Sequence, residues 1–255
     1  MKLAMPGALA HSYKSHAQQA RVVTEAWGED NLFCPSCDAE RLTRSAPNRE
    51  AIDFSCPQCR ELFQLKSRST GLAGKIVDAA YDAMQRAIVS GHTPNLFALH
   101  YDRSQWDVLN LIVVPRFAYS LSAIEKRKPL SSSARRANWV GCNILLGNIP
   151  PDARIIVVKG GIVTDARTVR QQFARLRPLE RIKHDARGWT LDVLNVVRTL
   201  NRKEFLLQDV YAFAEQLQKL HPGNRHVPDK IRQQLQVLRD LGFVEFLGHG
   251  RYQSV

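Results

Sequence analysis

Residues 34–66 read CPSCDAERLTRSAPNREAIDFSCPQCRELFQLK, a stretch that combines two cysteine pairs with an acidic residue and a Gln-Leu-Lys string. Cys34 and Cys37 form one Cys-x-x-Cys pair, and Cys56 and Cys59 form another after 18 intervening residues. Two thiolates from each turn can reach one tetrahedral ion, which is the pattern of a structural Zn²⁺ site. Four sulfur ligands leave no position for an activated water, so we expect a structural zinc. The alternative is cysteines that are simply buried or form disulfides.

A carboxylate and a lysine flank the second cysteine pair. Asp53 sits on one predicted strand, and eleven residues later Gln64-Leu65-Lys66 begins on the next. Alternate side chains of a strand point to the same face, so Gln64 and Lys66 share a face that excludes Leu65. We predict metal-assisted phosphodiester hydrolysis in which Asp53 and the Leu65 carbonyl bind Mg²⁺ and Lys66 positions or deprotonates the attacking water. The alternative is a set of solvated strand residues.

The apolar pattern of the remaining chain predicts a mixed α/β fold in two parts. We expect helices over residues 12–27 and 71–90, strands over 51–55, 62–67, 96–101 and 106–114, and a hairpin of 154–158 with 162–163 around Gly160-Gly161. We interpret the basic stretch 174–187 as the link between the two parts. We expect Glu25, in the first predicted helix, on the helix surface, and the alternative is an approach to the metal site.

The C-terminal pattern predicts a small DNA-binding domain. Three amphipathic helices over 188–200, 207–221 and 229–241 precede two short strands around Gly248-His249-Gly250. This order is typical of a winged helix, and a helical cap on the first part is the alternative. In the third helix, Ile231, Leu235 and Leu238 share one apolar face. The candidate DNA contacts on its polar side are Lys230, Arg232, Gln233 and Gln236, and an ordinary solvated face is the alternative.

The charge of the chain points to a polyanionic partner. The 36 basic and 24 acidic residues give a net charge of +12, with a sequence pI near 9.8, and such an excess favours nucleic acid. Part of it gathers at 125–139, whose candidate DNA contacts are Lys126, Arg127, Lys128, Arg135 and Arg136. Trp139 follows, and its flat apolar ring suits a methyl group in the major groove. The alternatives are a solvated loop and a core tryptophan.

The chain carries no pattern of membrane insertion. Its apolar runs, such as 108–115, are far shorter than the roughly 18 residues of a transmembrane helix, and Pro6 interrupts the short apolar N-terminus, which argues against a signal peptide. The odd number of cysteines, four of them in metal-like spacing, fits a reducing compartment, and we expect the fifth, Cys142, to be buried in the core. We expect a cytoplasmic monomer that does not bind membranes.

Several long motifs of the sequence resemble those of one family. They are YKSHAQQARVVTEAW, the CPSC and CPQC pairs, DFSCPQC…FQLKS, KRKPLSSSARRANWVGCNI, ARGWTLDVLN and KIRQQLQVLRD. The chain is similar over nearly its whole length to the DpnI-like restriction endonucleases, which cut DNA only when the adenine of GATC is methylated. The resemblance implies an α/β (α+β) PD-(D/E)XK nuclease core with an inserted zinc-binding knuckle over residues 1–182, followed by a winged helix over 183–255.

The resemblance also assigns roles to residues. Asp53, Gln64, the Leu65 carbonyl and Lys66 match the catalytic, Mg²⁺-binding motif, and the four paired cysteines match the zinc ligands. The family has Glu where this chain has Gln64, so the site loses one negative charge, although an amide oxygen can still bind Mg²⁺. Whether Gln64 is natural or an engineered change stays open at this point. The family also keeps the Arg-Arg-x-x-Trp string that ends at Trp139.

The combined prediction is a methyl-directed type II endonuclease that uses Mg²⁺, contains structural Zn²⁺ and acts on double-stranded DNA methylated at the adenine of GATC. One alternative is a zinc-containing winged-helix DNA-binding regulator whose nuclease fold is inactive. Another is an RNA-processing nuclease. Asp53 together with Gln64 and Lys66 distinguishes the endonuclease from the regulator, because a regulator has no need of them.

Overall fold

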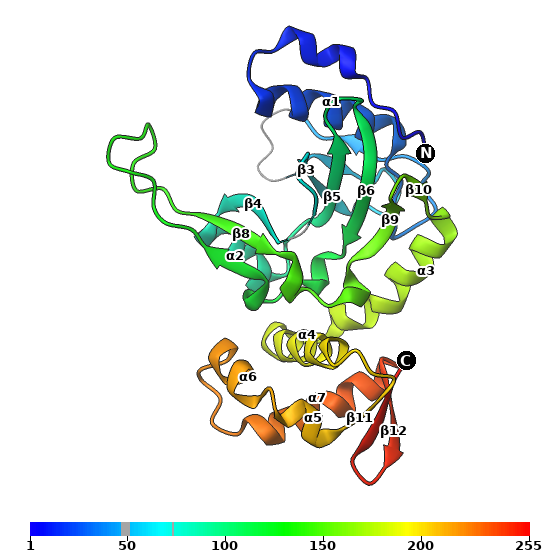
Figure 1. Ribbon diagram of the computed structural model, residues 1–255, viewed down its shortest axis with the longest axis vertical. Coiled ribbons are helices and arrows are strands. Elements are labelled where there is room, and N and C mark those ends of the chain that lie inside the picture. Colours follow the sequence, from blue (N-terminus) through cyan, green and yellow to red (C-terminus); the bar gives the residue numbers. More distant parts are fainter. Residues whose placement is uncertain (47–51, 73) are drawn as a thin grey trace.

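A mixed β-sheet organises the N-terminal part of the protein in the computed structural model, which describes residues 1–46, 52–72 and 74–255 (Figure 1). Its strands are β1 (Thr43–Arg44), β2 (Phe54–Ser55), β3 (Leu62–Arg68), β5 (Asn95–Asp102), β6 (Asp107–Val114), β9 (Ile155–Lys159) and β10 (Ile162–Val163). Within the described residues they follow the order β1-β2-β3-β5-β6-β9-β10. β3 and β5 run parallel and the other neighbours run antiparallel.

The predicted strands of this sheet are confirmed to within a few residues. The predicted strand 51–55 is shorter, because β2 begins at Phe54, and Ala51 lies outside the described residues. The predicted hairpin of β9 and β10 is present. Its turn residues Gly160 and Gly161 have φ of 56° and 77°. Two consecutive positive φ angles are what a tight hairpin turn requires, and glycine adopts them without strain.

A second sheet contains β4 (Lys75–Ala80), β8 (Gly141–Leu145) and β7 (Ile124–Lys126), in that order. The predicted helix over 71–90 is therefore wrong over residues 75–80, and only α2 (Tyr81–Ser90) is helical; Ala73 lies outside the described residues. Ile76 and Asp78 are buried while Lys75 and Val77 are exposed. This alternation of period two belongs to a strand, although Leu72, Ile76 and Val77 also fit a helical stripe.

Two helices complete the N-terminal part. α1 (His16–Asn31) lies against β3 and buries Val23 and Trp27. α3 (Ala166–Leu176) contacts β9 and buries Val169, Phe173 and Leu176, a spacing of four and three residues. The stretch 174–187, interpreted as the link between the two parts, is itself helical: it holds the end of α3, the 3₁₀ helix η6 (Arg177–Arg181) and the start of α4. Shorter 3₁₀ helices are η1 (Gly7–Ser12), η2 (Arg116–Ala118), η3 (Leu121–Ala123), η4 (Leu146–Asn148) and η5 (Pro151–Ala153).

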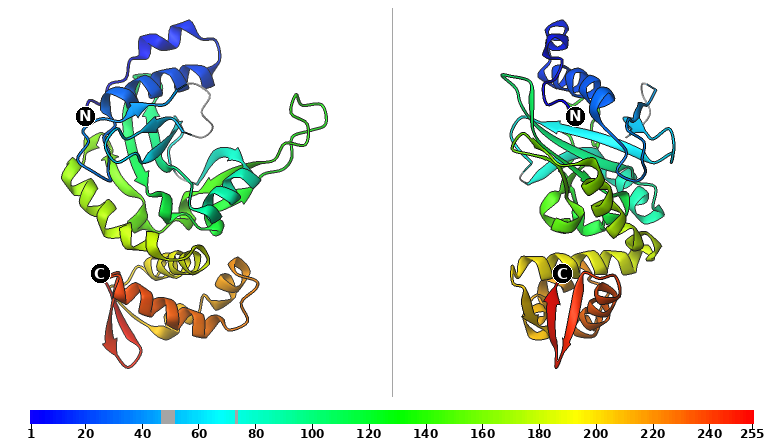
Figure 2. Two further views of the ribbon diagram at one scale, coloured as in Figure 1. Left: turned by 180° about the vertical axis from the view of Figure 1, so that it is seen from behind. Right: turned by 90° about the vertical axis from the view of Figure 1, so that its right-hand side faces the viewer.

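The C-terminal part follows the element order predicted for a winged helix. Its elements are α4 (His184–Thr199), β11 (Glu204–Leu206), α5 (Leu207–Tyr211), α6 (Ala214–Leu220), α7 (Val227–Asp240), β12 (Val244–Gly248) and β13 (Arg251–Ser254). The predicted second helix is divided into α5 and α6. α4 contacts α7 on one side and α2 and η3 on the other. It therefore lies between the two parts, as Figures 1 and 2 show.

The burial pattern agrees with the predicted core. Cys142 is 0% exposed, as expected, and so are Ile231, Leu235 and Leu238 of α7. Among the described residues, no helix has the length and apolar character to span a lipid bilayer.

Candidate functional site

Asp53 lies beside β3 and is held there by two hydrogen bonds. Its Oδ2 accepts a hydrogen bond from the Leu65 backbone N–H at 2.7 Å, and its own N–H donates to the Phe63 carbonyl at 2.9 Å. The next residue, Phe54, is fully buried and fixes the start of β2 in the core. The structure thus brings the predicted carboxylate next to the strand that carries Gln64 and Lys66.

Gln64 and Lys66 converge on a carboxylate that the sequence analysis did not identify. Gln64 Nε2 donates a hydrogen bond to Asp78 Oδ1, and Lys66 Nζ lies 2.8 Å from the same oxygen. The Asp78 side chain is 1% exposed, whereas that of Lys66 is 29% exposed. Gln64 and Lys66 therefore share one face of β3. Lys66 keeps enough exposure to reach a group bound at the surface.

The electrostatics of Asp53 reflect its buried position. Burial raises the pKa of the Asp53 carboxyl above its usual range, against the opposing effects of the Leu65 N–H and the Lys66 ammonium. In the described part of the chain, Asp53 Oδ1 accepts no hydrogen bond. The Asp53 carboxylate is half-buried and lies next to the strand that carries the Gln64 amide and the Leu65 carbonyl. These groups are the kind of oxygen donors that Mg²⁺ takes.

Glu25 extends this acidic region from α1. Its side chain is 11% exposed and lies between two guanidinium groups, with Arg21 Nε at 2.7 Å and Arg44 also hydrogen-bonded. Its charge is close enough to affect the pKa of Asp53. The expectation that Glu25 is a surface carboxylate is wrong. It is buried because α1 packs against β3 through this face.

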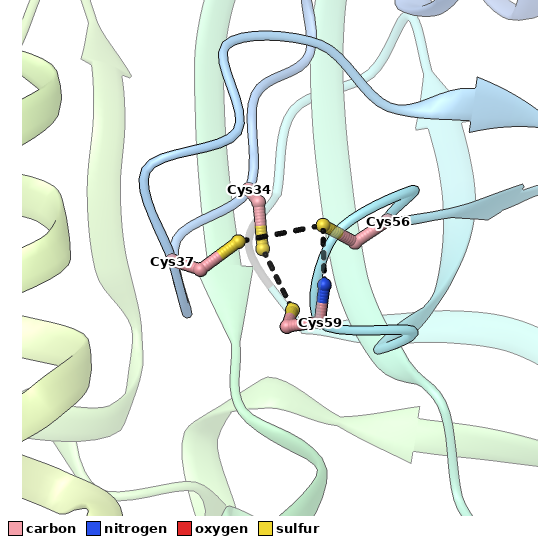
Figure 3. Close-up of side chains that lie close together, drawn as sticks. All are labelled: Cys34, Cys37, Cys56 and Cys59. Atoms are coloured by element: carbon pink, nitrogen blue, oxygen red, sulfur yellow. Dashed lines mark hydrogen bonds between the residues drawn. The ribbon is translucent and has the colours of Figure 1, made fainter.

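The four paired cysteines form the second candidate site (Figure 3). Their sulfurs lie within 4.8 Å of one another, with 3.6 Å between Cys34 and Cys59 and 3.4 Å between Cys37 and Cys56. A tetrahedral zinc with Zn–S bonds of about 2.3 Å requires sulfurs about 3.8 Å apart. A disulfide would need about 2.05 Å. The arrangement fits a zinc ion, and the disulfide alternative is wrong.

Backbone N–H groups contact two of the cysteine sulfurs and favour the thiolate form that binds a cation. The Ser36 N–H points at Cys34 Sγ and the Cys59 N–H at Cys56 Sγ, both at 3.4 Å. Although burial opposes it, hydrogen bonding from the Cys59 and Gln58 N–H groups lowers the pKa of Cys56 to about 7. Burial raises the pKa of Cys34. A bound cation would offset that penalty, because it favours the thiolate.

Arginines from α3 and η6 hold the first cysteine turn. Arg170 donates to the backbone carbonyls of Cys34 and Ala39 at 3.1 and 3.2 Å, and Arg177 donates to the Ser36 carbonyl at 3.0 Å. The second turn lies between Asp53 and β3 in sequence. The cysteine cluster therefore ties the loop that carries Asp53 to the body of the protein.

The predicted basic loop is a long hairpin between β7 and β8 that projects from the protein in Figure 1. Backbone hydrogen bonds continue the hairpin beyond the strands, from Arg127 to Gly141 and from Leu130 to Trp139. The structure places the predicted contacts on both of its arms, and most are exposed. The exposed residues are Lys126, Lys128, Arg135 and Arg136, and the half-buried ones are Arg127 and Trp139.

Trp139 packs within the hairpin and not in the protein core. Its ring is covered by the Arg136 guanidinium, 4.9 Å from the ring centroid. It also lies against Gly141, where an added Cβ would come within 2.7 Å of the ring. Only glycine leaves that space for the indole. The alternative of a core tryptophan is therefore wrong, and the indole is half-buried.

The predicted contacts on α7 lie on its polar face. Arg232, Gln233 and Gln236 are exposed, and Lys230 is half-buried. Lys230 Nζ donates to Gln233 Oε1 at 2.8 Å, and Arg232 Nε donates to the Tyr211 hydroxyl. These contacts preorganise the face. The structure does not bring it together with Asp53, because α4 separates the two parts.

Sequence reasoning missed Asp78 and the burial of Glu25. A period-two reading of residues 75–80 would have placed Asp78 on a strand. Nothing local in the sequence indicates that this strand meets β3, because the contact is made between two sheets.

Comparison with protein families gives two matches that together cover nearly the whole chain. A family model described as DpnI, the Dam-replacing family, matches residues 1–182. A second, described as DpnI_C, the Dam-replacing HTH domain, matches residues 185–254. The second match falls on the elements from α4 to β13.

Proposed function

The chain belongs to the DpnI Dam-replacing family, as its motifs predicted, and we propose that it is a methyl-directed type II restriction endonuclease. It cleaves double-stranded DNA at GATC sites that carry N6-methyladenine. We propose two domains, a PD-(D/E)XK nuclease with a zinc knuckle over residues 1–182 and a winged helix over 183–255. The observation that carries the proposal is the juxtaposition of Asp53 with β3, since a DNA-binding protein without catalysis needs no such arrangement.

In this proposal Asp53, the Gln64 amide oxygen and the Leu65 carbonyl bind Mg²⁺. When bound, the ion would neutralise charge on the scissile phosphate and activate a water. Lys66 donates hydrogen bonds from its ammonium group and offsets charge that develops on the phosphate. Its contact with Asp78 at 2.8 Å favours this donor role over that of a base. The half-buried Asp53 carboxylate holds its free oxygen toward the reacting groups.

A structural Zn²⁺ would be held by Cys34, Cys37, Cys56 and Cys59, which would then fix the loop that carries Asp53. All four positions are sulfur, so the ion has no open position for chemistry. Its role is to hold the loop at a fixed distance from β3.

Two basic surfaces, the β7–β8 hairpin and α7, both contact the DNA in this proposal. The hairpin contacts phosphates through Lys126, Lys128 and its arginines, and Trp139 packs against the methyl group. α7 enters the major groove with Arg232, Gln233 and Gln236, as recognition helices do. N6-methylation leaves one amine hydrogen for base pairing, so methyl recognition is steric and apolar.

One observation favours a second candidate, a DNA-binding regulator with an inactive nuclease fold. Gln64 stands where the resembling family has Glu, so the site carries one negative charge fewer. A plasmid cleavage assay distinguishes the endonuclease from the regulator. Plasmids from adenine-methylating and non-methylating hosts are incubated with the protein, with and without Mg²⁺. Cleavage of the methylated plasmid alone, only with Mg²⁺, supports the endonuclease, and binding without cleavage supports the regulator.

A further inference from the structure

Asp78 is a buried carboxylate that the expected active site does not include. Its side chain is 1% exposed, and an ionised carboxylate at such a position is unfavourable unless it is paired. Its partners are the Gln64 amide and the Lys66 ammonium, both on the same oxygen. Both partners belong to the candidate site, so any change at Asp78 acts on that site first.

The backbone of β4 directs Asp78 toward this site. The regular pairing of β4 with β8 ends at Val77 and resumes at Ala80, and between them two residues of β4 face one residue of β8. Such a bulge re-aims a side chain, and bulges are frequent beside active sites. Asp78 lies at the bulge and reaches β3, which belongs to the other sheet.

The contact with Asp78 fixes the orientation of the Gln64 amide. The nitrogen and the oxygen of an amide lie in one plane, on opposite sides of the bond that joins the group to the rest of the side chain. Because Nε2 donates to Asp78, Oε1 points away from Asp78, and no group among the described residues donates a hydrogen bond to it. Donation to a carboxylate also polarises the amide and increases the negative charge on Oε1. Without Asp78, the amide could turn and present its N–H groups instead.

We propose that Asp78 is a positioning residue that supplies, through the Gln64 amide, the negative charge that an acidic residue at position 64 would provide directly. The inference rests on the proposed function, because it assigns Gln64 to the Mg²⁺ site. It explains how a neutral amide serves at that position. The site keeps its negative charge, which is carried by Asp78 behind Gln64 and not by residue 64 itself.

A purely structural role for Asp78 makes different predictions. An ion pair that only neutralises Lys66 would stabilise the fold and leave metal affinity unchanged in Asp78→Asn. Exchanging the amide of residue 64 with the carboxylate of residue 78 distinguishes the positioning role from the structural role. The double variant Gln64→Glu/Asp78→Asn has the same net charge as the parent, and the amide introduced in place of the Asp78 carboxylate can still donate to position 64 and accept from Lys66.

Binding of Mn²⁺, measured by electron paramagnetic resonance on the full-length protein without DNA, tests the proposal. Asp78→Asn should weaken Mn²⁺ binding by about tenfold or more, the range found when a group that orients a ligand is removed. The exchanged variant should recover binding to within about threefold of the parent, as expected for coupled residues. The control Asp82→Asn removes one negative charge from an exposed position of α2 and should leave the Mn²⁺ affinity unchanged. On methylated DNA, Asp78→Asn should lower kcat and leave KM unchanged.

Parental Mn²⁺ affinity in Asp78→Asn would overturn the proposal, and so would an exchanged variant that binds as weakly as Asp78→Asn. If Asp78→Asn does not fold, Gln64→Glu is compared with the exchanged variant. The proposal predicts about tenfold tighter Mn²⁺ binding by Gln64→Glu, which keeps Asp78; equal affinities would overturn it.

The proposed function is tested separately on the parent protein. A parent that binds Mn²⁺ but does not cut methylated plasmid contradicts the endonuclease proposal, while the affinities still decide the role of Asp78. A parent that binds no Mn²⁺ contradicts both.

Discussion

The carboxylate of Asp53 accepts a hydrogen bond from the backbone N–H of Leu65 at 2.7 Å. This contact joins the two halves of the candidate site, which are separated in sequence by the second cysteine turn. It places one oxygen of Asp53 against β3 and leaves the other free. The site is thus built from a loop fixed by cysteines and a strand fixed by the sheet.

Asp53→Asn should stabilise the metal-free protein at neutral pH and strongly slow cleavage. Burial raises the pKa of Asp53 above the ordinary 3.8. A carboxyl with a raised pKa stabilises the fold fully below pH 3.8, and this contribution is lost as pH rises through the raised value. At pH 7 the ionised group is therefore unfavourable, and Asn should add about 1 kcal/mol. The gain should shrink toward pH 4, which thermal melts in Mg²⁺-free buffer measure.

Cleavage by Asp53→Asn should fall by about 100-fold or more, since a group that stabilises developing charge is lost. A variant that melts below the parent at pH 7, or that cuts as fast, contradicts this account of Asp53.

Removal of zinc should lower stability and activity together. The cysteine pairs close a loop of 18 intervening residues, and releasing such a loop costs about 3 kcal/mol. That loss corresponds to a fall in Tm of roughly 6–12 °C for a protein of this size. The measurement is Tm and zinc content before and after a strong chelator. Cys142→Ala serves as the control and should keep one zinc per chain. An unchanged Tm after complete chelation would contradict a structural role for zinc.

Trp139→Ala should reduce discrimination between methylated and plain GATC. A methyl group in an apolar contact is worth about tenfold or more in specificity. Because the ring packs within a projecting hairpin, Tm should change little. The measurement is the ratio of cleavage rates on the two DNAs. Lys128→Ala removes only a phosphate contact and should slow both reactions equally. If Trp139→Ala keeps the parental ratio, another residue reads the methyl group.

Gln64→Glu should bind Mg²⁺ more tightly and fold less stably without it. The added carboxylate provides a charged ligand, and we expect a metal midpoint lower by about tenfold. In the absence of metal, it lies against Asp78 and replaces a hydrogen bond by like-charge repulsion. Mg²⁺ titrations of cleavage and of Tm measure both effects. Gln171→Glu, at an exposed position of α3, is the charge-matched control. Equal midpoints for parent and Gln64→Glu would reject the Mg²⁺ role of residue 64.

The cysteine site could be predicted because its chemistry is local. Each Cys-x-x-Cys turn brings two sulfurs together wherever it occurs, so spacing alone predicts the cluster. The strands β5 and β6 were predictable for a similar reason, because a buried apolar run bounded by turn residues has few other conformations.

Asp78 could not be predicted because its role depends on contact between two sheets. Residues 72–88 fit a helical stripe, and only the pairing of β4 with β8 makes residues 75–80 a strand. The bulge that aims Asp78 at β3 is a property of that pairing. The burial of Glu25 likewise depends on how α1 packs on β3, which its own helical pattern does not encode.

The central claim is that this chain cuts DNA in response to adenine methylation. Its most direct test is the single-turnover cleavage rate, with Mg²⁺, on two duplexes that each contain one GATC and differ only in N6-methylation of its adenines. We predict rapid cleavage of the methylated duplex, a rate lower by about 100-fold or more on the plain duplex, and strongly slowed cleavage by Asp53→Asn. Equal rates on the two duplexes, or cleavage by Asp53→Asn at the parental rate, would contradict the account.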